Sequence, residues 1–184
     1  MQIIQNQIEP EVGCIRLNVG CGNKILKGFI NIDLPDNYSG KKPDIEADVR
    51  KLPLSDNYAD ELHAIHVIEH FYVWEIIDIL SEWKRVLKPN GILILELPDL
   101  NKILLWFKIK SINSQMTFWG LYGDPNHKNP AMCHKWAYTF NMLEGLLSEI
   151  GFINIKEEIP QFHVKERDMR IIAFKQEKEI VYAE

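Results

Sequence analysis

The chain has 184 residues, of which 46% are hydrophobic and 26% are charged, the usual balance of a soluble globular domain. Lysine and arginine total 21 against 26 acidic residues, and the formal net charge of −5 argues against nucleic acid and anionic membrane surfaces as partners. The three cysteines form no CxxC pair, and no apolar run approaches the roughly 20 residues that span a bilayer. Residues 1–11 lack a signal-peptide pattern. We therefore expect one cytoplasmic domain over residues 1–184, with neither a disulfide framework nor a cysteine-based zinc site.

Short apolar segments precede the first helical pattern. They predict strands over residues 15–20, 29–33, 43–49 and 61–67. Residues 73–87 then carry apolar side chains at helical spacing. This helix should stop at Lys88-Pro89-Asn90-Gly91, because proline cannot continue a helix and glycine tolerates a positive φ.

The second half continues the alternation of strands and helices. Residues 92–97 form a continuous apolar run, as expected of a parallel strand covered on both faces. A helix is predicted over residues 141–150, followed by strands over 152–157 and 169–174. This order predicts an open, mostly parallel α/β sheet, whose ligands bind at the carboxyl ends of the strands.

A glycine loop follows the first predicted strand. Gly20 and Gly22 allow a tight turn and a close approach of backbone N–H groups to a ligand, but Ile25 stands where a dinucleotide fingerprint needs its third glycine. Asp33 ends the second strand, where a carboxylate can accept two hydrogen bonds from a ribose diol. Asp48 ends the third, where it could accept from an exocyclic amine. Either aspartate alone could be an ordinary turn residue, whereas the ordered set points to a nucleoside-containing ligand.

Five segments together resemble the class I S-adenosylmethionine-dependent methyltransferases, in the order found in that family. They are LNVGCG (17–22), INIDL (30–34), ADVRKLPLSDNYADEL (47–62), HVIEHF (66–71) and RVLKPNGILILELP (85–98). The last is typical of the small-molecule branch. The resemblance implies an α/β, Rossmann-like, seven-stranded, mostly parallel sheet with its last strand antiparallel and helices on both faces.

The resemblance also implies how S-adenosylmethionine would be held. The glycine loop would pass under the methionine part, Asp33 would hold the ribose, Asp48 with the Val49 amide would hold the adenine, and His66 would lie beside the methionine part. The cofactor-binding residues expected in this way are Gly20, Cys21, Gly22, Asp33, Leu34, Asp48, Val49 and His66.

Three features depart from the family pattern. Lys24 stands where many members have a third glycine, and Asn18 stands where many have an acid. The interval from Gly20 to Asp33 is also short, so the first crossover helix should be almost absent.

His66, Glu69 and His70 form an H-x-x-E-H motif. On a helix this spacing is the inverted zinc-peptidase signature, which belongs to a different fold. Some O-methyltransferases carry E-x-x-E-H at this place and bind a magnesium-like ion, and His134 could complete such a set here. The favoured interpretation is that Glu69 and His70 cap and orient the start of a helix, so that no metal ion is expected.

Residues at about 100–138 interrupt the core pattern and are rich in large apolar side chains. They either pack on the sheet edge or form a lid over the methyl donor. Removal of a proton from an acceptor hydroxyl suits a histidine, so His134 is the first catalytic candidate, followed by His127 and Asp99. Each of them taken singly is more often structural. A short polar tail is expected at about 176–184.

The expected function is O-methylation of a small molecule or glycan acceptor. The alternatives are a catalytically silent cofactor-binding subunit and, at low weight, an H-x-x-E-H metallohydrolase. Small-molecule members of the family that the chain resembles usually have helices before strand one that cover the acceptor, whereas only about a dozen residues precede it here. The resemblance therefore implies that the acceptor site is either open, for a large or polymeric substrate, or covered by another subunit, which leaves a homo-oligomer open. Arg167 and Arg170 could bind an anionic acceptor group or only pair with Asp168 or solvent.

Overall fold

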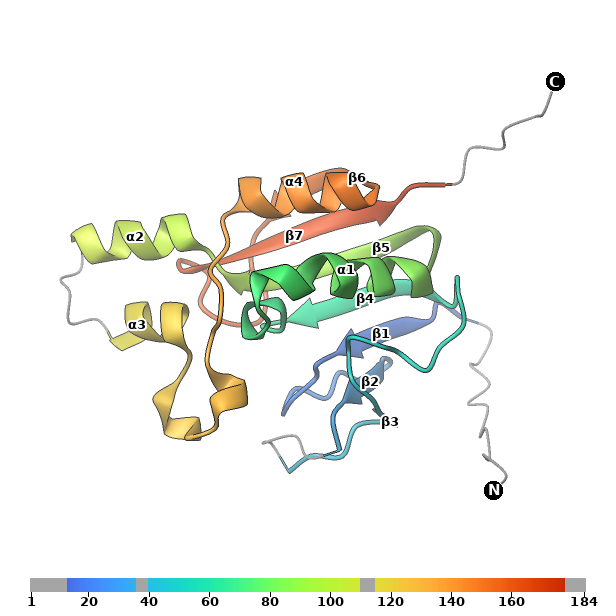
Figure 1. Ribbon diagram of the computed structural model, residues 1–184, viewed down its shortest axis with the longest axis horizontal. Coiled ribbons are helices and arrows are strands. Elements are labelled where there is room, and N and C mark those ends of the chain that lie inside the picture. Colours follow the sequence, from blue (N-terminus) through green and yellow to red (C-terminus); the bar gives the residue numbers. More distant parts are fainter. Residues whose placement is uncertain (1–12, 36–39, 110–114, 178–184) are drawn as a thin grey trace.

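The computed structural model describes residues 13–35, 40–109 and 115–177 (Figure 1). Seven strands form one sheet in the order β3-β2-β1-β4-β5-β7-β6. The strands are β1 (Arg16–Val19), β2 (Ile30–Asp33), β3 (Ile45–Glu46), β4 (Ala59–Ile65), β5 (Leu87–Pro98), β6 (Phe152–Glu158) and β7 (Asp168–Lys175). Strands β1 to β5 pair in parallel, and β7 lies antiparallel between β5 and β6. The predicted sheet, with its last strand antiparallel, is confirmed.

Three predicted strands differ from the structure by more than one residue at an end. The fifth spans Leu87–Pro98 instead of 92–97, so the segment Lys88-Pro89-Asn90-Gly91, expected as a turn, is part of the strand. The third is only two residues long, because Pro43 has no N–H and the Asp44 carboxylate accepts the Asn31 N–H at 2.8 Å just before it. The fourth ends at Ile65, because His66 adopts a positive φ of 55°. Asp48 and His66 therefore both lie in turns beyond their strands.

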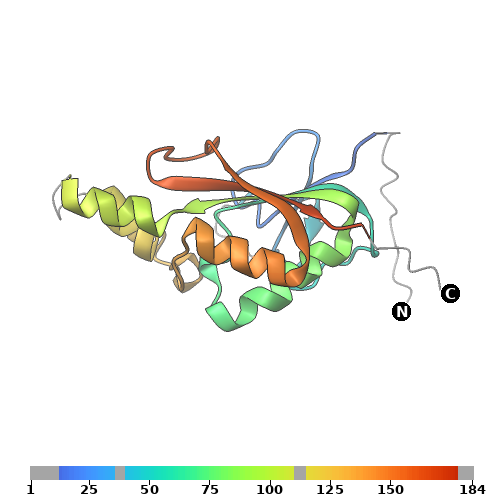
Figure 2. The ribbon, with the colours of Figure 1, turned by 90° about the horizontal axis from the view of Figure 1, so that it is seen from above.

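Helices α1 (Ile76–Val86) and α4 (Phe140–Ile150) lie side by side on one face of the sheet (Figure 2). A 3₁₀ turn, η2 (Val73–Glu75), leads into α1. Helix α4 begins at Thr139, whose hydroxyl accepts the Met142 N–H, and ends at Gly151 with φ 91°. Both helices match the predicted ones closely. The buried Trp83 of α1 donates its indole N–H to the Val49 carbonyl at 2.9 Å and so fixes the turn after β3.

The opposite face differs from the expectation of helices on both faces. Within the described part of residues 13–67 there is no helix, and the first crossover, residues 20–29, runs as turns and extended chain. This agrees with the short interval noted in the sequence, because a helical crossover needs about a dozen residues or more. The first helical turn of the described chain is the 3₁₀ turn η1 (Ile68–His70).

The insertion between β5 and α4 extends beyond the end of the sheet (Figure 1). It contains α2 (Leu100–Ile109), α3 (Gln115–Tyr122), η3 (Pro125–His127) and η4 (Pro130–Met132). Its two ends meet, since Asp99 and Tyr138 form a bridge and the Leu100 N–H donates to the Tyr138 carbonyl at 2.8 Å. Among the described residues no helix is both long and apolar enough to cross a bilayer.

A buried charge pair ties the sheet to the loop before β7. Glu96 lies in the predicted apolar run of β5 and is fully buried. Its carboxylate accepts N–H groups of Gln161 and Phe162 at 2.8 and 2.7 Å and pairs with Arg170 at 3.1 Å. Arg170 is its cross-strand partner in the β5–β7 register. The pair holds the loop of residues 159–167 over the sheet.

Candidate active site

A cavity of about 680 Å³ opens at the carboxyl ends of β1, β2 and β4. This volume lies within the range of small-molecule sites. All eight residues expected to bind the cofactor line it: Gly20, Cys21, Gly22, Asp33, Leu34, Asp48, Val49 and His66. The other wall comes from the insertion, with Met116, Trp119, His127, Met132 and His134 among its lining residues.

The glycine loop lies close against the sheet. Gly20 has φ 63°, and a Cβ built on it would lie 2.7 Å from Val67 Cγ2, so a side chain would meet both strain and a clash. Two of the three departures from the family pattern, Asn18 and Lys24, support this loop. Asn18 donates its side-chain N–H to the Lys24 carbonyl at 2.8 Å, and Lys24 Nζ donates to the Phe162 carbonyl at 3.3 Å.

The two aspartates have different surroundings. Asp33 accepts the N–H groups of Gly22 and Leu34, at 2.6 and 2.7 Å. Asp48 binds the guanidinium of Arg50 through both carboxylate oxygens, with a shortest distance of 2.6 Å. This hydrogen bonding lowers the pKa of Asp48. Arg50 also lines the cavity and was missed in the sequence, where nothing marks it as a partner of Asp48 beyond its place two residues later.

His66 is held between two carboxylates. Its Nε2 lies 3.1 Å from Asp168 Oδ2, and its Nδ1 lies 3.0 Å from Glu69 Oε1. Burial opposes its charge, but hydrogen bonds to Asp168 and Glu69 raise the pKa of His66 to about 9. The ring of His163, an exposed residue, lies 4.0 Å away between centroids, and desolvation together with the charge of His66 lowers its pKa to about 4. The cavity wall beside the glycine loop therefore carries a protonated His66 side chain that is paired with the carboxylates of Asp168 and Glu69.

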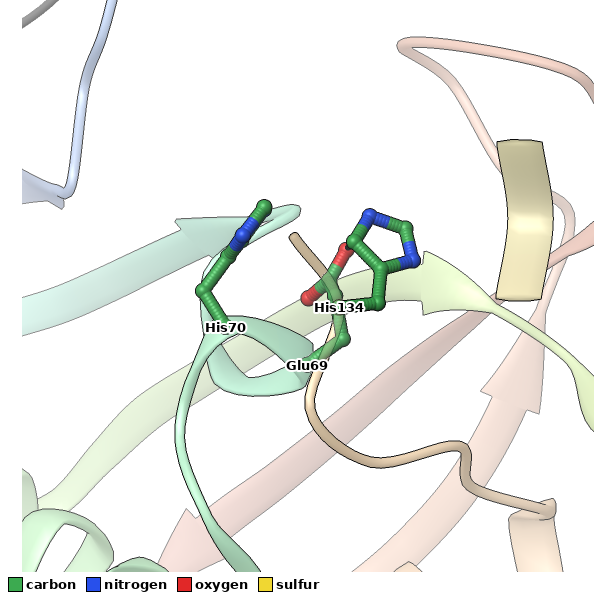
Figure 3. Close-up of side chains that lie close together, drawn as sticks. All are labelled: Glu69, His70 and His134. Carbon is green, nitrogen blue, oxygen red and sulfur yellow. Dashed lines mark ion pairs between the residues drawn. The ribbon is translucent and has the colours of Figure 1, made fainter. Parts of the chain in front are cut away.

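Glu69, His70 and His134 lie close together (Figure 3). One ligand atom from each lies within 4.8 Å of the other two. His134 Nδ1 lies 3.0 Å from the Gly120 carbonyl oxygen. Burial lowers the pKa of both His70 and His134. Burial opposes the charge of Glu69, but its hydrogen bond with His66 dominates and lowers the pKa of Glu69 to about 2.

The three catalytic candidates differ in whether they line the cavity. His134 is largely buried and lines the cavity, and His127 lines it from the more exposed η3 turn. Asp99 does not line it: its carboxylate accepts the Asn101 N–H at 2.9 Å, at the start of α2, and burial raises its pKa. A strand-end acid directly before a helix is used here as a cap.

The two late arginines pair inside the protein. Arg167 Nε lies 2.6 Å from Asp168 Oδ1, and Arg170 is the partner of Glu96. Both arginines are buried, although Arg167 also lines the cavity. Pairing with Asp168, one of the two roles considered from the sequence, is therefore found for Arg167, whereas the pairing of Arg170 with Glu96 was missed.

These residues fit S-adenosylmethionine. The loop at Gly20 has no room for a side chain, the Asp33 carboxylate is held at the cavity wall, and the cavity is large enough for a nucleoside-sized group. When bound, this cofactor supplies an electrophilic methyl group on a sulfonium.

Comparisons with known proteins point the same way. Residues 17–95 match the family model described as "Methyltransferase domain". No curated protein matches the chain.

Solved structures share the fold at low identity. A methyltransferase from Archaeoglobus fulgidus is 20% identical, with 89% of this chain and 87% of that one covered and a TM-score of 0.61. One from Methanosarcina mazei is 18% identical, with 92% and 95% covered and a TM-score of 0.62. Human N-acetylserotonin methyltransferase, solved with S-adenosylmethionine, is 16% identical, with 89% and 48% covered and a TM-score of 0.61.

The family match covers the glycine loop, both aspartates and the turn at His66, and the sheet has the strand order and antiparallel last strand of these structures. Residues 17–95 thus match a methyltransferase family, the whole chain has the fold of the class I S-adenosylmethionine-dependent methyltransferases, and S-adenosylmethionine is the methyl donor of that family.

Proposed function

We propose that this enzyme methylates a hydroxyl group of a small molecule or a glycan. The observation that carries the proposal is that the insertion and the cofactor residues line one cavity, with a largely buried histidine, His134, on the insertion side. An acceptor bound against the insertion would therefore face the methyl donor.

The acceptor wall supports this class of substrate. Trp119, Met116 and Met132 supply apolar surface, while Asn129 and His127 supply polar groups. Binding sites for polar organic molecules combine such apolar walls with a few polar groups that fix orientation. A sugar ring or a hydroxylated aromatic ring presents the same combination of surfaces.

The reaction needs a path for one proton. The acceptor oxygen forms a bond to the methyl carbon while the carbon–sulfur bond breaks, the electron pair stays on sulfur as a thioether, and the hydroxyl proton must leave. Of the three candidates, His134 fits best, because it lines the cavity and because burial lowers the pKa of its ring, which favours the neutral form that can accept a proton. It can act as a general base or as a ligand of a metal ion that acidifies the hydroxyl.

The metallohydrolase alternative has no support in the geometry. His66 lies outside a helix, with a φ of 55°, and the turn η1 that follows is a 3₁₀ turn. Both of its ring nitrogens face carboxylates, so His66 and His70 do not form the paired ligands of a zinc-peptidase helix.

The test is transfer of tritiated methyl groups from S-adenosylmethionine into lysate fractions sorted by size and chemistry. We expect label in small molecules or glycans, and none with Asp33→Ala at the same cofactor concentration below saturation. Label confined to protein or RNA would contradict the acceptor class. A folded protein that binds S-adenosylmethionine by calorimetry yet labels nothing would favour the silent subunit.

A further inference from the structure

Lys24 is a cation of the cavity wall without an acidic partner. Arg50, His66 and Arg167, which also line the cavity, each lie within ion-pair distance of a carboxylate. Lys24 Nζ instead donates to the backbone carbonyl of Phe162 at 3.3 Å, lies 5.7 Å from the centroid of that ring, and forms no ion pair with any residue that the structure describes. Because an ammonium group carries three N–H donors, two donors of Lys24 remain for a ligand.

The side chain of Lys24 extends from the glycine loop to the side of the cavity remote from the nucleoside candidates. Asp48 follows β3 and Asp33 ends β2, on one side of β1 in the sheet. Phe162, which Lys24 contacts, belongs to the loop before β7, on the other side of β1. Besides desolvation, the nearby charge of Lys24 contributes to the lowered pKa of His163 in the same loop. The ammonium group therefore lies where the methionine part of the cofactor is expected.

The other charges at this end of the cavity balance one another. His66 and Arg167 carry positive charges, and Glu69 and Asp168, which contact them, carry negative charges. Lys24 adds one positive charge that no contacting carboxylate opposes. Burial lowers the pKa of Lys24, although carboxylates at longer range oppose this effect. An anionic ligand in contact with Nζ would replace the solvation that burial removes.

We propose that the Lys24 ammonium binds the α-carboxylate of the methionine part of S-adenosylmethionine. This carboxylate is the only one in the cofactor, and it lies at the end remote from the adenine. Many members of the family have a glycine at the position of Lys24, so the contact does not follow from the family pattern. The flexible lysine stem and the long hydrogen bond to Phe162 allow Nζ to turn toward the ligand. The inference concerns the methyl donor alone and is independent of the acceptor class.

The test is calorimetry with two ligands that differ only in the carboxylate. S-Adenosylhomocysteine, the demethylated product, carries the carboxylate without the sulfonium charge, and its decarboxylated analogue keeps the adenosine, the thioether and the amine. Wild-type protein should bind the analogue about 10- to 150-fold more weakly, the range expected for a hydrogen bond between charged groups. In Lys24→Met this preference should nearly disappear, because the affinity for S-adenosylhomocysteine falls while that for the analogue stays. Lys24→Arg, which keeps the charge, should retain most of the preference.

Lys41→Met is the matched control. Lys41 Nζ also donates to a carbonyl oxygen of the glycine loop, that of Asn23 at 2.9 Å, but Lys41 does not line the cavity. This variant should keep the full preference for the carboxylate. Lys135→Met is the rival variant, because Lys135 lines the cavity and donates to the His70 carbonyl oxygen without a carboxylate partner among the residues described.

Several results would overturn the inference. Wild-type protein that binds both ligands equally, or neither, would do so without any variant. Equal losses for the two ligands in Lys24→Met would mean that Lys24 only supports the glycine loop. A preference that disappears in Lys135→Met and persists in Lys24→Met would assign the carboxylate to Lys135. No acceptor is present in these measurements, so a carboxylate preference that depends on Lys24 would support the inference even in a protein that methylates no hydroxyl.

Discussion

The backbone N–H of Gly22 donates to Asp33 Oδ2 at 2.6 Å, so the loop that ends β1 holds the carboxylate that ends β2. This contact makes the ribose-binding candidate part of the glycine loop. Asp33→Ala should therefore weaken S-adenosylmethionine binding by about 1–3 kcal/mol, which is about 5- to 150-fold. Calorimetry with the cofactor and with its demethylated product measures the loss. Asp78→Ala, at an exposed position of α1, is the control, and equal affinity in both variants would contradict the role of Asp33.

Gly20→Ala should lower the free energy of unfolding by more than backbone strain alone would. Gly20 and Gly40 have nearly the same φ, 63° and 66°, but a Cβ at Gly20 would lie 2.7 Å from Val67, whereas one at Gly40 meets nothing within 4 Å. Gly40→Ala should thus lower the free energy of unfolding by only about 1–2 kcal/mol, the cost of a non-glycine residue in the left-handed region. Gly20→Ala should lose more stability in urea unfolding and bind the cofactor more weakly. Equal losses in the two variants would show that the clash with Val67 is relieved at no cost.

Cys21 should react slowly with alkylating reagents although it lines the cavity. Burial, assisted by the charge of Asp33, raises the pKa of its thiol to about 12, so little thiolate exists at pH 8. Cys14 and Cys133 are exposed. With iodoacetamide at pH 8, peptide mass spectrometry should find these two modified first and Cys21 modified only after denaturation. Early modification of Cys21 in folded protein would contradict its buried, protonated state.

Asp168→Asn should destabilise the fold strongly. Asp168 is fully buried between Arg167 and His66, and removing one partner of such a set costs about 3–5 kcal/mol. Burial opposes the charge of Asp168, but its hydrogen bonds with His66 and Arg167 lower its pKa to about 2. Because the folded-state pKa lies below the ordinary value, this stabilisation is complete above about pH 4 and is lost as the pH falls toward 2.

Urea unfolding of wild type and Asp168→Asn at several pH values checks this. The difference in unfolding free energy should be largest near neutral pH and shrink in acid, while Asp78→Asn stays close to wild type at every pH. A difference that does not shrink below pH 4 would mean that the charge of Asp168 contributes little.

The parts of the site that follow from local sequence could be predicted. Gly20, Asp33 and Asp48 each come at the end of a short apolar run, so the parallel order of the strands alone brings them to one edge of the sheet. The outcome at Asp99 shows the limit of this argument. It also ends a strand, but the helix that follows at once uses its carboxylate as a cap.

The contacts that span the chain could not be predicted in this way. Glu96 meets Arg170 only through the register of the antiparallel pair β5–β7, and His66 meets Asp168 across 102 residues. Strand register depends on packing of whole faces and not on any local motif. A glutamate inside an otherwise apolar run was a visible signal that a buried partner exists, but nothing in the sequence named Arg170.

The β-bridge between Asp99 and Tyr138 has a consequence for how the insertion can vary between related proteins. Because the insertion leaves and rejoins the sheet at adjacent residues, its interior can grow, shrink or be exchanged without shifting any strand. Doubling the length of a flexible loop costs only about 0.6 kcal/mol of closure entropy. The insertion, which we propose as the acceptor wall, can thus vary in length and sequence while the strands that end at the glycine loop and at Asp33 keep their positions.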